Sequence, residues 1–387
     1  MSQVSKELIL AEIPLFEGLT RDQSRLIQER STFKEFKKGQ IIYAEGSPPS
    51  AFYCVVLGRA VIYSGGLHGN RTVLEYLHRG KYFGIISLLT NEPHSVTAQA
   101  LNDCLLVVIE KTDFDFILKK IPRLAIDLSR TLSRRLKRKD IHQKTIFEST
   151  IVSVFSSHSR SGKSVYALNL SLSLFKEARK SVLIVDILPQ DKLHSLPHRL
   201  DIKTEVPVMD LCQGRTGYEK FAKENILKTS FGIDLACFYY RDEDESCMKK
   251  LMEFLSLLVN DYHYIILDLP ALMDRSIFGL LNQSDLIHIL TGPDRVDLKK
   301  TRHLTERLRK EFNFSDEKIK IIVNEYKLSV MPHEEQAEIL GKSVFATLPK
   351  IELVSSDRLV LDDPQCEYAK AVRRISRQLS ESLVGLV

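Results

Sequence analysis

Residues 152–164 read Val152-Ser153-Val154-Phe155-Ser156-Ser157-His158-Ser159-Arg160-Ser161-Gly162-Lys163-Ser164. The apolar start predicts a strand, the small residues predict a loop, and the apolar positions between Tyr166 and Leu174 predict a helix. Such a loop directs backbone N–H groups and the positive end of the helix at one point, which suits a phosphate group. The alternative is a Ser/Gly-rich turn that ends in a solvated lysine.

Four side chains in this half suit a nucleotide with Mg²⁺. The Lys163 ammonium would meet the β- and γ-phosphates, and the Ser164 hydroxyl would bind Mg²⁺. The apolar runs Val182–Asp186 and Tyr264–Asp268 each end in an acid, and a carboxylate beside a phosphate loop is placed to hold Mg²⁺ or its water. The alternative for each acid is a cap on the next turn. The candidate catalytic residues are therefore Lys163, Asp186 and Asp268, and the candidate Mg²⁺ ligands are Ser164, Asp186 and Asp268.

The remainder of this half alternates between apolar β-rich runs and amphipathic helices. The predicted strands are Ser181–Asp186, Tyr262–Asp268, Leu286–Thr291, Lys320–Asn324 and Val344–Thr347. The predicted helices are Val296–Phe312 and Glu367–Leu383. This alternation predicts an α/β domain with a doubly wound, mostly parallel sheet and a ligand at the carboxyl ends of the strands.

The composition is that of an ordinary globular protein with two domains. The chain has 387 residues, 44% of them hydrophobic and 27% charged, which argues against disorder. The six cysteines form no C-x-x-C pair and the histidines form no H-E-x-x-H, so we expect reduced thiols and no metal other than Mg²⁺. No apolar run reaches about 18 residues and the first residues lack a signal-peptide core, so we expect a cytoplasmic protein.

The first half has a different pattern, typical of an all-β domain. Short β-rich runs separated by turn residues are Gln40–Tyr43, Ala51–Leu57, Arg59–Tyr63, Thr72–Leu77, Thr97–Ala100 and Leu105–Ile109. They predict an antiparallel barrel or jelly roll. Helical periodicity from Asp113 to about Glu148 predicts one long exit helix. We place the domains at residues 1–148 and 149–387.

A basic segment accounts for the excess of positive charge. The net charge is +5, and seven basic residues lie between Arg130 and Lys144. Such a segment suits nucleic acid or an anionic membrane surface, and the blander alternative is a solvated connecting helix.

Residues 10–145 resemble the cyclic-nucleotide-binding domain of catabolite-activator-type regulators and cyclic-nucleotide-dependent kinases. The resemblance is strongest over residues 82–98, which match the family's phosphate-binding cassette without a gap. The positions carried over are Gly84, Ile85, Ser87, His94 and Ser95. The family has a ribose-binding Glu at the position of Ile85 and a phosphate-binding Arg at the position of His94. Losing both charge-assisted bonds weakens binding by several powers of ten, so we expect a degenerate site without high-affinity cAMP binding. The alternative is a differently recognised ligand, such as another second messenger.

Residues 150–387 resemble the deviant-Walker ATPases of the ParA/MinD group, most closely its CpaE/TadZ branch. The family opens with Lys-Gly-Gly-x-Gly-Lys-Thr, and here the window is 158–164; Asp268-Leu269-Pro270 matches Walker B and Asn324 the adenine-contacting Asn. The nucleotide-binding residues implied are Ser159, Arg160, Ser161, Gly162, Lys163, Ser164, Val165 and Asn324. His158 replaces the lysine that reaches a partner's phosphates, a role that Arg160 is long enough to take. Leu188 replaces the aspartate that positions the attacking water.

These observations predict an ATP- and Mg²⁺-binding regulatory or localisation protein with weak or absent hydrolysis. The resemblance implies a homodimer that serves pilus or secretion machinery, at a cell pole or at the periphery of the inner membrane, with the first domain as a sensor or docking module. The alternatives are a DNA-associated partition ATPase, a transcription regulator, or a scaffold with two degenerate nucleotide sites. The final residues 373–387 are faintly amphipathic, so membrane contact is a further alternative to packing of Ile375, Leu379 and Leu383 on the sheet.

Overall fold

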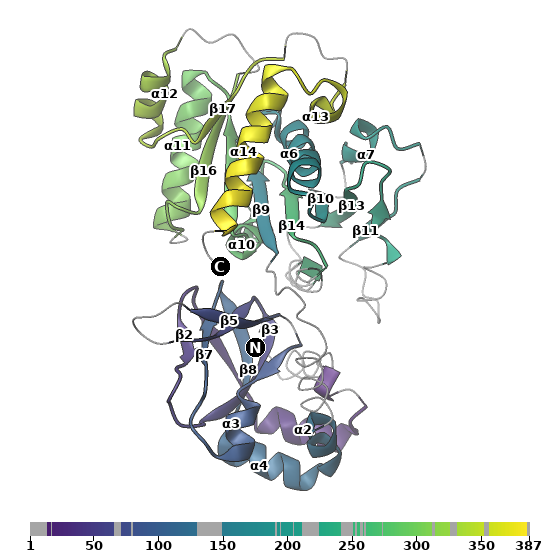
Figure 1. The fold of residues 1–387 in the computed structure, drawn as a ribbon, viewed down its shortest axis with the longest axis vertical. Helices are drawn as coiled ribbons and strands as arrows, with labels where there is room; N and C mark the ends of the chain where they lie inside the picture. Colours follow the sequence, from purple (N-terminus) through teal and green to yellow (C-terminus); the bar gives the residue numbers. More distant parts are fainter. Residues whose placement is uncertain are drawn as a thin grey trace. The chain divides into compact units, whose positions relative to one another are not determined.

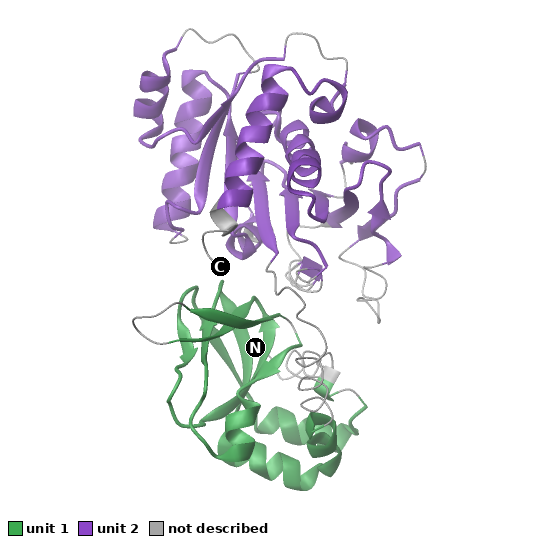
Figure 2. Cartoon of the chain, in the orientation of Figure 1, with its two compact units in different colours: residues 1–148 green, residues 149–387 purple. Residues whose placement is uncertain are grey.

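The chain divides into two compact units, residues 1–148 and 149–387 (Figure 2). The computed structural model describes residues 14–16, 18–65, 71–78, 80–129, 149–189, 192–193, 195–203, 205–210, 224–240, 251, 254–255, 258, 261–272, 274–311, 314–325, 331–351 and 356–384. The basic segment between Arg130 and Lys144 lies outside these residues.

The first unit is built on two antiparallel sheets, as the sequence predicts. Among the described residues, one sheet has the strand order β1-β8-β3-β6 and the other β2-β7-β4-β5. The strands are β1 (Thr32–Phe36), β2 (Ile41–Tyr43), β3 (Ala51–Leu57), β4 (Ala60–Ser64), β5 (Thr72–Leu77), β6 (Tyr82–Phe83), β7 (Thr97–Ala100) and β8 (Cys104–Glu110). Short strands that alternate with tight turns close this jelly-roll-like core around their apolar side chains.

The sequence predicted a single helix in the first unit, and the structure differs from that prediction. They are η1 (Pro14–Phe16), α2 (Arg21–Glu29), α3 (Ile85–Thr90) and α4 (Lys111–Lys120). A single exit helix over residues 113–148 is wrong, because α4 ends at Lys120 and residues 122–129 form a separate helical segment. Pro122 lacks an N–H group and disfavours the helical conformation in the residue before it, and Ile121 has φ −127° and ψ 75°. The rest of the predicted helix lies outside the described residues.

The second unit is a nine-stranded, mostly parallel sheet within the described residues (Figure 1). The strand order is β11-β13-β10-β14-β9-β15-β16-β17, and β12 pairs with β13 in the antiparallel sense. The strands are β9 (Thr150–Phe155), β10 (Val182–Pro189), β11 (Val208–Asp210), β12 (Leu227–Lys228), β13 (Asp234–Tyr240), β14 (Tyr264–Asp268), β15 (Leu286–Thr291), β16 (Ile319–Asn324) and β17 (Ala346–Leu348). This confirms the predicted α/β fold class.

Helices cover both faces of this sheet. They are α6 (Lys163–Ala178), α7 (Leu196–Arg199), α10 (Arg275–Gln283), α11 (Arg295–Lys310), α12 (His333–Leu340), α13 (Leu359–Asp362) and α14 (Glu367–Val384). Because side chains alternate along a strand, Val182 and Ile184 of β10 pack under α6 and α14, whereas Leu183 and Val185 pack with α10 and α11 on the opposite face. The sequence did not predict β11, β12, β13, α7, α10, α12 or α13.

Helix α14 lies against α6 on one face of the sheet (Figure 1). Ser376 Oγ of α14 is 2.7 Å from Ser173 Oγ of α6, and Ile375 and Leu379 belong to the apolar core on that face. The apolar positions of the faintly amphipathic C-terminal segment are therefore packed on the sheet as far as Leu379. The side chain of Leu383 is not among those that the structure describes. None of the described helices is long and apolar enough to span a membrane.

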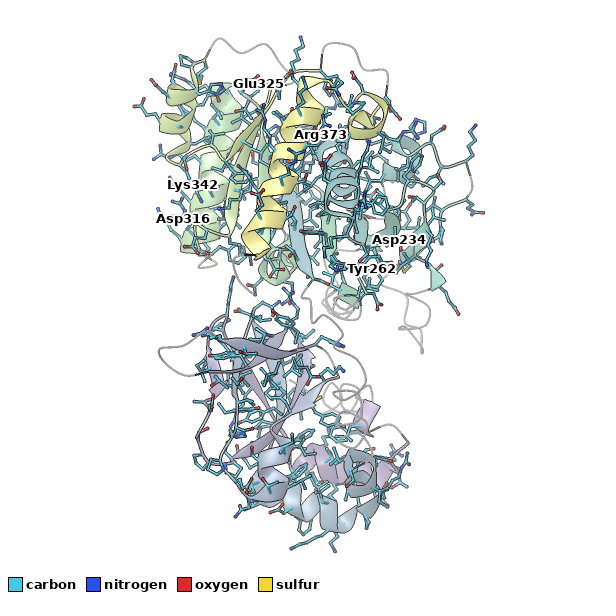
Figure 3. The ribbon with its side chains drawn as sticks, in the orientation of Figure 1. Asp234, Tyr262, Asp316, Glu325, Lys342 and Arg373 are labelled. Atoms are coloured by element: carbon cyan, nitrogen blue, oxygen red, sulfur yellow. The ribbon has the colours of Figure 1, made fainter. Side chains whose placement is uncertain are left out.

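Local polar pairs fasten the edges of the second unit, and Figure 3 labels two of them. Tyr262 Oη donates to Asp234 Oδ2 at 2.7 Å, which joins β13 to the residues that precede β14. Lys342 Nζ lies 3.1 Å from Asp316 Oδ1, so this pair joins the residues that follow α12 to those that follow α11.

Candidate functional site

Two acids lie side by side in the second unit. Asp186 of β10 and Asp268 of β14 are paired in register on neighbouring parallel strands. Each continues the alternation that faces α6, since Ile184 and Ile266 precede them on that face. Both are buried, with 2% and 4% of their surface exposed. Asp268 ends its strand as predicted, but β10 runs on to Pro189, so the prediction that Asp186 ends its strand is wrong.

The first turn of α6 reaches this acid pair. Gly162 precedes the helix with φ +88°, a left-handed conformation that glycine adopts without steric cost. Lys163 and Ser164 are the first two helical residues, and both side chains act on Asp268 by lowering the pKa of its carboxyl group. The loop between β9 and α6 thus brings a hydroxyl and an ammonium group to the carboxylates.

The electrostatics of Asp268 show a site that is poor in compensating charge. Burial and the neighbouring Asp186 raise the pKa of Asp268 to about 7, and Lys163, Ser164 and Arg199 oppose part of that rise. Burial also lowers the pKa of Lys163, and Lys192 adds to that effect. Two buried carboxylates side by side are costly without a cation between them.

The residues present fit a magnesium ion and a phosphate group. Asp268 Oδ1 and Ser161 Oγ are buried and have no hydrogen-bond partner among the described residues. A hydroxyl and two carboxylates are the oxygen donors that Mg²⁺ prefers. The donor set and the two unsatisfied atoms are therefore consistent with a bound Mg²⁺–phosphate group.

Asn324, at the end of β16, is hydrogen-bonded to the loop. Its side-chain Nδ2 donates to the carbonyl of Ser161 at 2.9 Å, and a Cβ added to Gly162 would lie 2.2 Å from the same nitrogen. Asn324 is 6% exposed at the end of β16, and Glu325 follows it at the carboxyl end of that strand (Figure 3). In this structure the Asn324 amide supports the loop.

The side chain of His158 lies against α11. Its Nε2 lies 3.5 Å from Asp297 Oδ2, and its side chain is 15% exposed. The preceding Ser157 Oγ lies 3.2 Å from Thr301 Oγ1, one turn further along α11. Burial lowers the pKa of His158, with Lys300 and Lys163 adding to the decrease and Asp297 opposing it, so the imidazole is neutral at pH 7.

The other predicted loop residues are placed as follows. Ser159 and Arg160 are exposed at the tip of the loop, and Arg160 has φ +63°. Val165 is half-buried in the first turn of α6, where its carbonyl accepts from Asn169 Nδ2 at 2.8 Å. Leu188 is half-buried near the end of β10. The structure therefore gathers Ser161, Gly162, Lys163, Ser164, Asp186, Asp268 and Asn324, and leaves Ser159 and Arg160 at the surface.

Two basic residues that the sequence analysis did not name follow β10. Lys192 is exposed and acts on the charge of Lys163. Arg199 ends α7, acts on the charge of Asp268, and pairs through Nη1 with Asp357 Oδ2 at 2.8 Å. Both residues lie within 15 residues of Asp186 in the sequence, which could have marked them as candidates. The sequence analysis did not predict α7, however, so it gave no reason to place them near the loop.

The predicted cassette of the first unit is intact as a backbone structure. Gly84 precedes α3 with φ +80°, and a Cβ there would lie 2.9 Å from the carbonyl of Ala51. Ile85 and Ser87 on α3 are buried, and Ile85 belongs to the core between the sheet and the helices. The side chain of Ile85 thus packs in the protein interior.

His94 is stacked on an aromatic ring inside the barrel. Its ring lies 3.7 Å from that of Tyr43 with an angle of 12° between the planes. Tyr43 is also in ring contact with Tyr53 and Phe83, and its phenolic oxygen accepts from the backbone N–H of Gly84. His94 is 2% exposed, its Nε2 has no hydrogen-bond partner among the described residues, and burial lowers its pKa. Ser95, the next residue, is exposed.

Comparison with known proteins assigns the first unit. Residues 33–120 match the cyclic nucleotide-binding domain family. The cyclic AMP receptor protein of Thermus thermophilus is 29% identical over 128 residues, which are 33% of this chain and 59% of that protein. The cAMP-dependent protein kinase regulatory subunit of Mycosarcoma maydis is 31% identical over 113 residues, which are 28% of this chain and 21% of that protein. The chain thus matches less than two thirds of the length of either relative.

The second unit is similar to a solved structure of a ParA family ATPase from Chlorobium tepidum TLS. The identity is 20% and the TM-score 0.49, and the match covers 59% of this chain and 99% of that chain. Residues 33–120 of the first unit are therefore similar to cyclic nucleotide-binding domains, and the second unit is a mostly parallel α/β domain with a glycine-containing loop between β9 and α6.

Proposed function

We propose that residues 149–387 bind ATP with Mg²⁺ at the loop between β9 and α6, and that they hydrolyse it weakly or not at all. The observation that carries this proposal is the register of Asp186 and Asp268 on adjacent strands, beside the first turn of α6. Lys163 and Ser164 both lower the pKa of Asp268. A lysine, a hydroxyl and two carboxylates in this arrangement match the requirements of a Mg²⁺–triphosphate.

Each residue has a distinct role in this proposal. Lys163 meets the terminal phosphates, and the backbone N–H groups at the start of α6 contribute to the same anion site. Ser164 and Asp268 hold Mg²⁺, with Asp186 beside them as ligand or as acceptor for a metal-bound water. The metal, when bound, neutralises charge on the phosphate oxygens. Asn324 keeps Gly162 and Ser161 in the conformation that presents the loop, through its bond to the Ser161 carbonyl.

Weak hydrolysis follows from two side chains that phosphoryl transfer needs and this chain lacks. Leu188 has no group that orients a water molecule, and His158 is directed to Asp297 and neutral at pH 7. Positioning and electrostatic stabilisation supply most of the catalysis of phosphoryl transfer. We therefore expect binding without efficient turnover, as in a regulatory switch.

The wider role that we propose rests on the motifs of residues 150–387. Their resemblance to deviant-Walker ATPases of the CpaE/TadZ type supports a nucleotide-dependent homodimer that localises pilus or secretion components. In this proposal the cyclic nucleotide-binding domain at residues 33–120 acts as the sensor or docking module. DNA contact remains the second candidate, through the basic residues between Arg130 and Lys144.

A binding assay with matched variants tests the nucleotide site. Isothermal titration of the full chain with Mg-ATP should give binding, and Lys163→Ala should abolish it while leaving the thermal unfolding of the protein unchanged within a few degrees. Lys176→Ala, in the last turn of the same helix, serves as the control and should bind as the unmodified protein does. Equal and negligible binding by the unmodified protein and Lys163→Ala would refute the proposal.

The first unit, in this proposal, does not bind cyclic nucleotide with high affinity. Tyr43 accepts from the Gly84 N–H and stacks on His94, so the chain's own side chains engage the cassette backbone and the position of the family's arginine. Titration of the full chain with cAMP and cGMP should show no binding at micromolar concentrations. A dissociation constant of about 1 μM or below would correspond to about 8 kcal/mol of binding energy and would refute this part.

A further inference from the structure

The loop between β9 and α6 contributes only one cation to the acid pair. His158 is neutral at pH 7 and its Nε2 lies 3.5 Å from Asp297 Oδ2 of α11, whereas Arg160 is exposed at the loop tip. Lys163 is therefore the one loop cation that is available to balance the two buried carboxylates, Asp186 and Asp268. A polyanion at this place needs positive charge from another element.

Helix α7 lies beside α6 on the other side of the loop. In the strand order, β15 and α11 are on one side of β9, whereas β10, which leads to α7, is on the other. Contacts join α7 and α13 to α6, and Figure 1 shows both short helices next to it. Leu196 of α7 is buried in the same core as the first turns of α6, so the helix is fixed in position.

A series of hydrogen bonds connects Arg199 of α7 to α6. Its Nη1 bonds to Asp357 Oδ2 at 2.8 Å, and the Asp357 carbonyl accepts from Asn169 Nδ2 at 2.8 Å. Asn169 Oδ1 in turn accepts from the N–H of Val360 at 2.9 Å. Asn169 is on the same helix as Lys163, six residues further along. Asn169 Nδ2 also donates to the carbonyl of Val165 at 2.8 Å, so these contacts extend to the first turn of α6.

The ion pair does not use the whole guanidinium group. Arg199 Nε is buried and has no hydrogen-bond partner among the described residues, although the side chain as a whole is 29% exposed. A partly exposed ion pair contributes little to stability, and a buried N–H group without an acceptor is unfavourable. An arginine presents up to five donors in a planar fork, which matches phosphate oxygens.

We propose that Arg199, oriented by Asp357, is a second phosphate-binding residue of the site between β9 and α6. This inference rests on the proposed function of that site and names the group that supplies, within one chain, the charge that His158 does not provide. The ligand class is a nucleoside polyphosphate, and the guanidinium binds its phosphate oxygens. Arg199 is a binding residue in this proposal, and Asp357 is a positioning residue.

Titration of the full chain with Mg-ATP tests the assignment. Arg199→Ala should raise the dissociation constant about 10- to 100-fold, the loss expected for a charge-assisted bond. Asp357→Asn keeps the guanidinium and should change the constant by less than about fivefold. Arg377→Ala is the matched control, because Arg377 pairs with Glu177 at 3.1 Å at the opposite end of α6, and it should bind as the unmodified protein does.

The pattern of outcomes separates this inference from the function it rests on. If Lys163→Ala loses binding and Arg199→Ala binds within twofold of the unmodified protein, the role of Arg199 is refuted and the nucleotide site stands. If Arg199→Ala and Asp357→Asn weaken binding equally, the ion pair has only a structural role and the inference is also refuted. Negligible binding by the unmodified protein refutes both. Should Arg199→Ala unfold, the double variant Arg199→Ala/Asp357→Ala removes the unpaired carboxylate and must still show the loss.

Discussion

Asp268 combines burial, a neighbouring carboxylate and a missing partner for Oδ1. Its folded-state pKa of about 7 lies above the ordinary value of 3.8, so the folded protein holds a proton here that the unfolded chain releases. Between those two values folding takes up a proton, and stability therefore falls as pH rises through that range. Asp268 is thus a destabilising residue at pH 8 unless a cation is bound.

Asp268→Asn should stabilise the protein without ligand at pH 8, by up to about 4 kcal/mol if the full shift is expressed. The gain should shrink as pH falls from 7 toward 4 and vanish below about 3.8, where the aspartate becomes protonated in the unfolded state as well. Thermal unfolding at pH 5 and pH 8 measures this. Asp316→Asn is the control, because Lys342 and Arg309 lower the pKa of Asp316, and its removal should not stabilise. A lower melting temperature for Asp268→Asn at pH 8 would contradict the prediction.

Gly162 is fixed by two independent constraints. Its φ of +88° is unfavourable for any side chain, and an added Cβ would lie 2.2 Å from Asn324 Nδ2. Gly162→Ala should therefore cost about 2–4 kcal/mol and abolish nucleotide binding. Asn324→Ala in the same protein removes the clash and leaves the backbone strain, so it should restore only part of the stability. Chemical denaturation of the single and double variants measures the coupling, and full additivity of the two changes would contradict the proposed clash.

At the scale of elements, β15 and α6 share a buried polar pair. The side chain of His288 on β15 faces α6, where Nδ1 lies 2.7 Å from Tyr166 Oη. Both residues are fully buried. Burial lowers the pKa of His288 to about 3, with Lys320 adding to the decrease, so the helix packs on a neutral imidazole.

The unfolded state should bind a proton at His288 below about pH 6.5, whereas the folded state should not until about pH 3. Stability should therefore fall as pH drops below 6.5, by at most about 1.4 kcal/mol per pH unit from this residue. His288→Gln should reduce that slope by about one proton. Urea unfolding between pH 5 and 7 measures it, with His303→Gln, exposed on α11, as the control. An unchanged slope for His288→Gln would show that His288 is protonated in the folded state.

At the scale of the whole molecule, the apolar cores belong to separate units. The clusters around Phe52 and Tyr53 contain only residues of the first unit, and those around Phe155, Leu168 and Val323 contain only residues of the second. Each unit has its own sheet system and its own buried interior. Independent folding is the expectation for units of this kind.

A fragment of residues 149–387 should therefore fold and bind Mg-ATP by itself. Its melting temperature should match one transition of the full chain within about 4 °C, since a loss of 1 kcal/mol shifts a domain of this size by about 2–4 °C. Calorimetry of fragment and full chain measures this. An unfolded fragment would show that the boundary proposed at residue 148 is wrong or that the second unit depends on the first.

Much of the fold and part of the candidate site could be predicted from local patterns. Most strands of the two units follow from apolar runs and turns, and Gly162, Lys163 and Asp268 are visible because loop, helix and strand end are local features. Pro122 was equally visible, but the apolar periodicity across it masked the break. Helix α7 has only four residues, too few to show a helical period, so Arg199 was missed.

The sequence by itself determined the two fold classes, the phosphate-type loop and the replacement of charged cassette positions by Ile85 and His94. Only the tertiary structure decided which groups meet: that Asp186 lies opposite Asp268, that His158 lies beside Asp297, and that Arg199 pairs with Asp357. The physical reason is that strand and helix periods are set by near neighbours in the chain. Pairing in register and electrostatic contacts depend on residues far apart in sequence, which the packing of the sheet brings together.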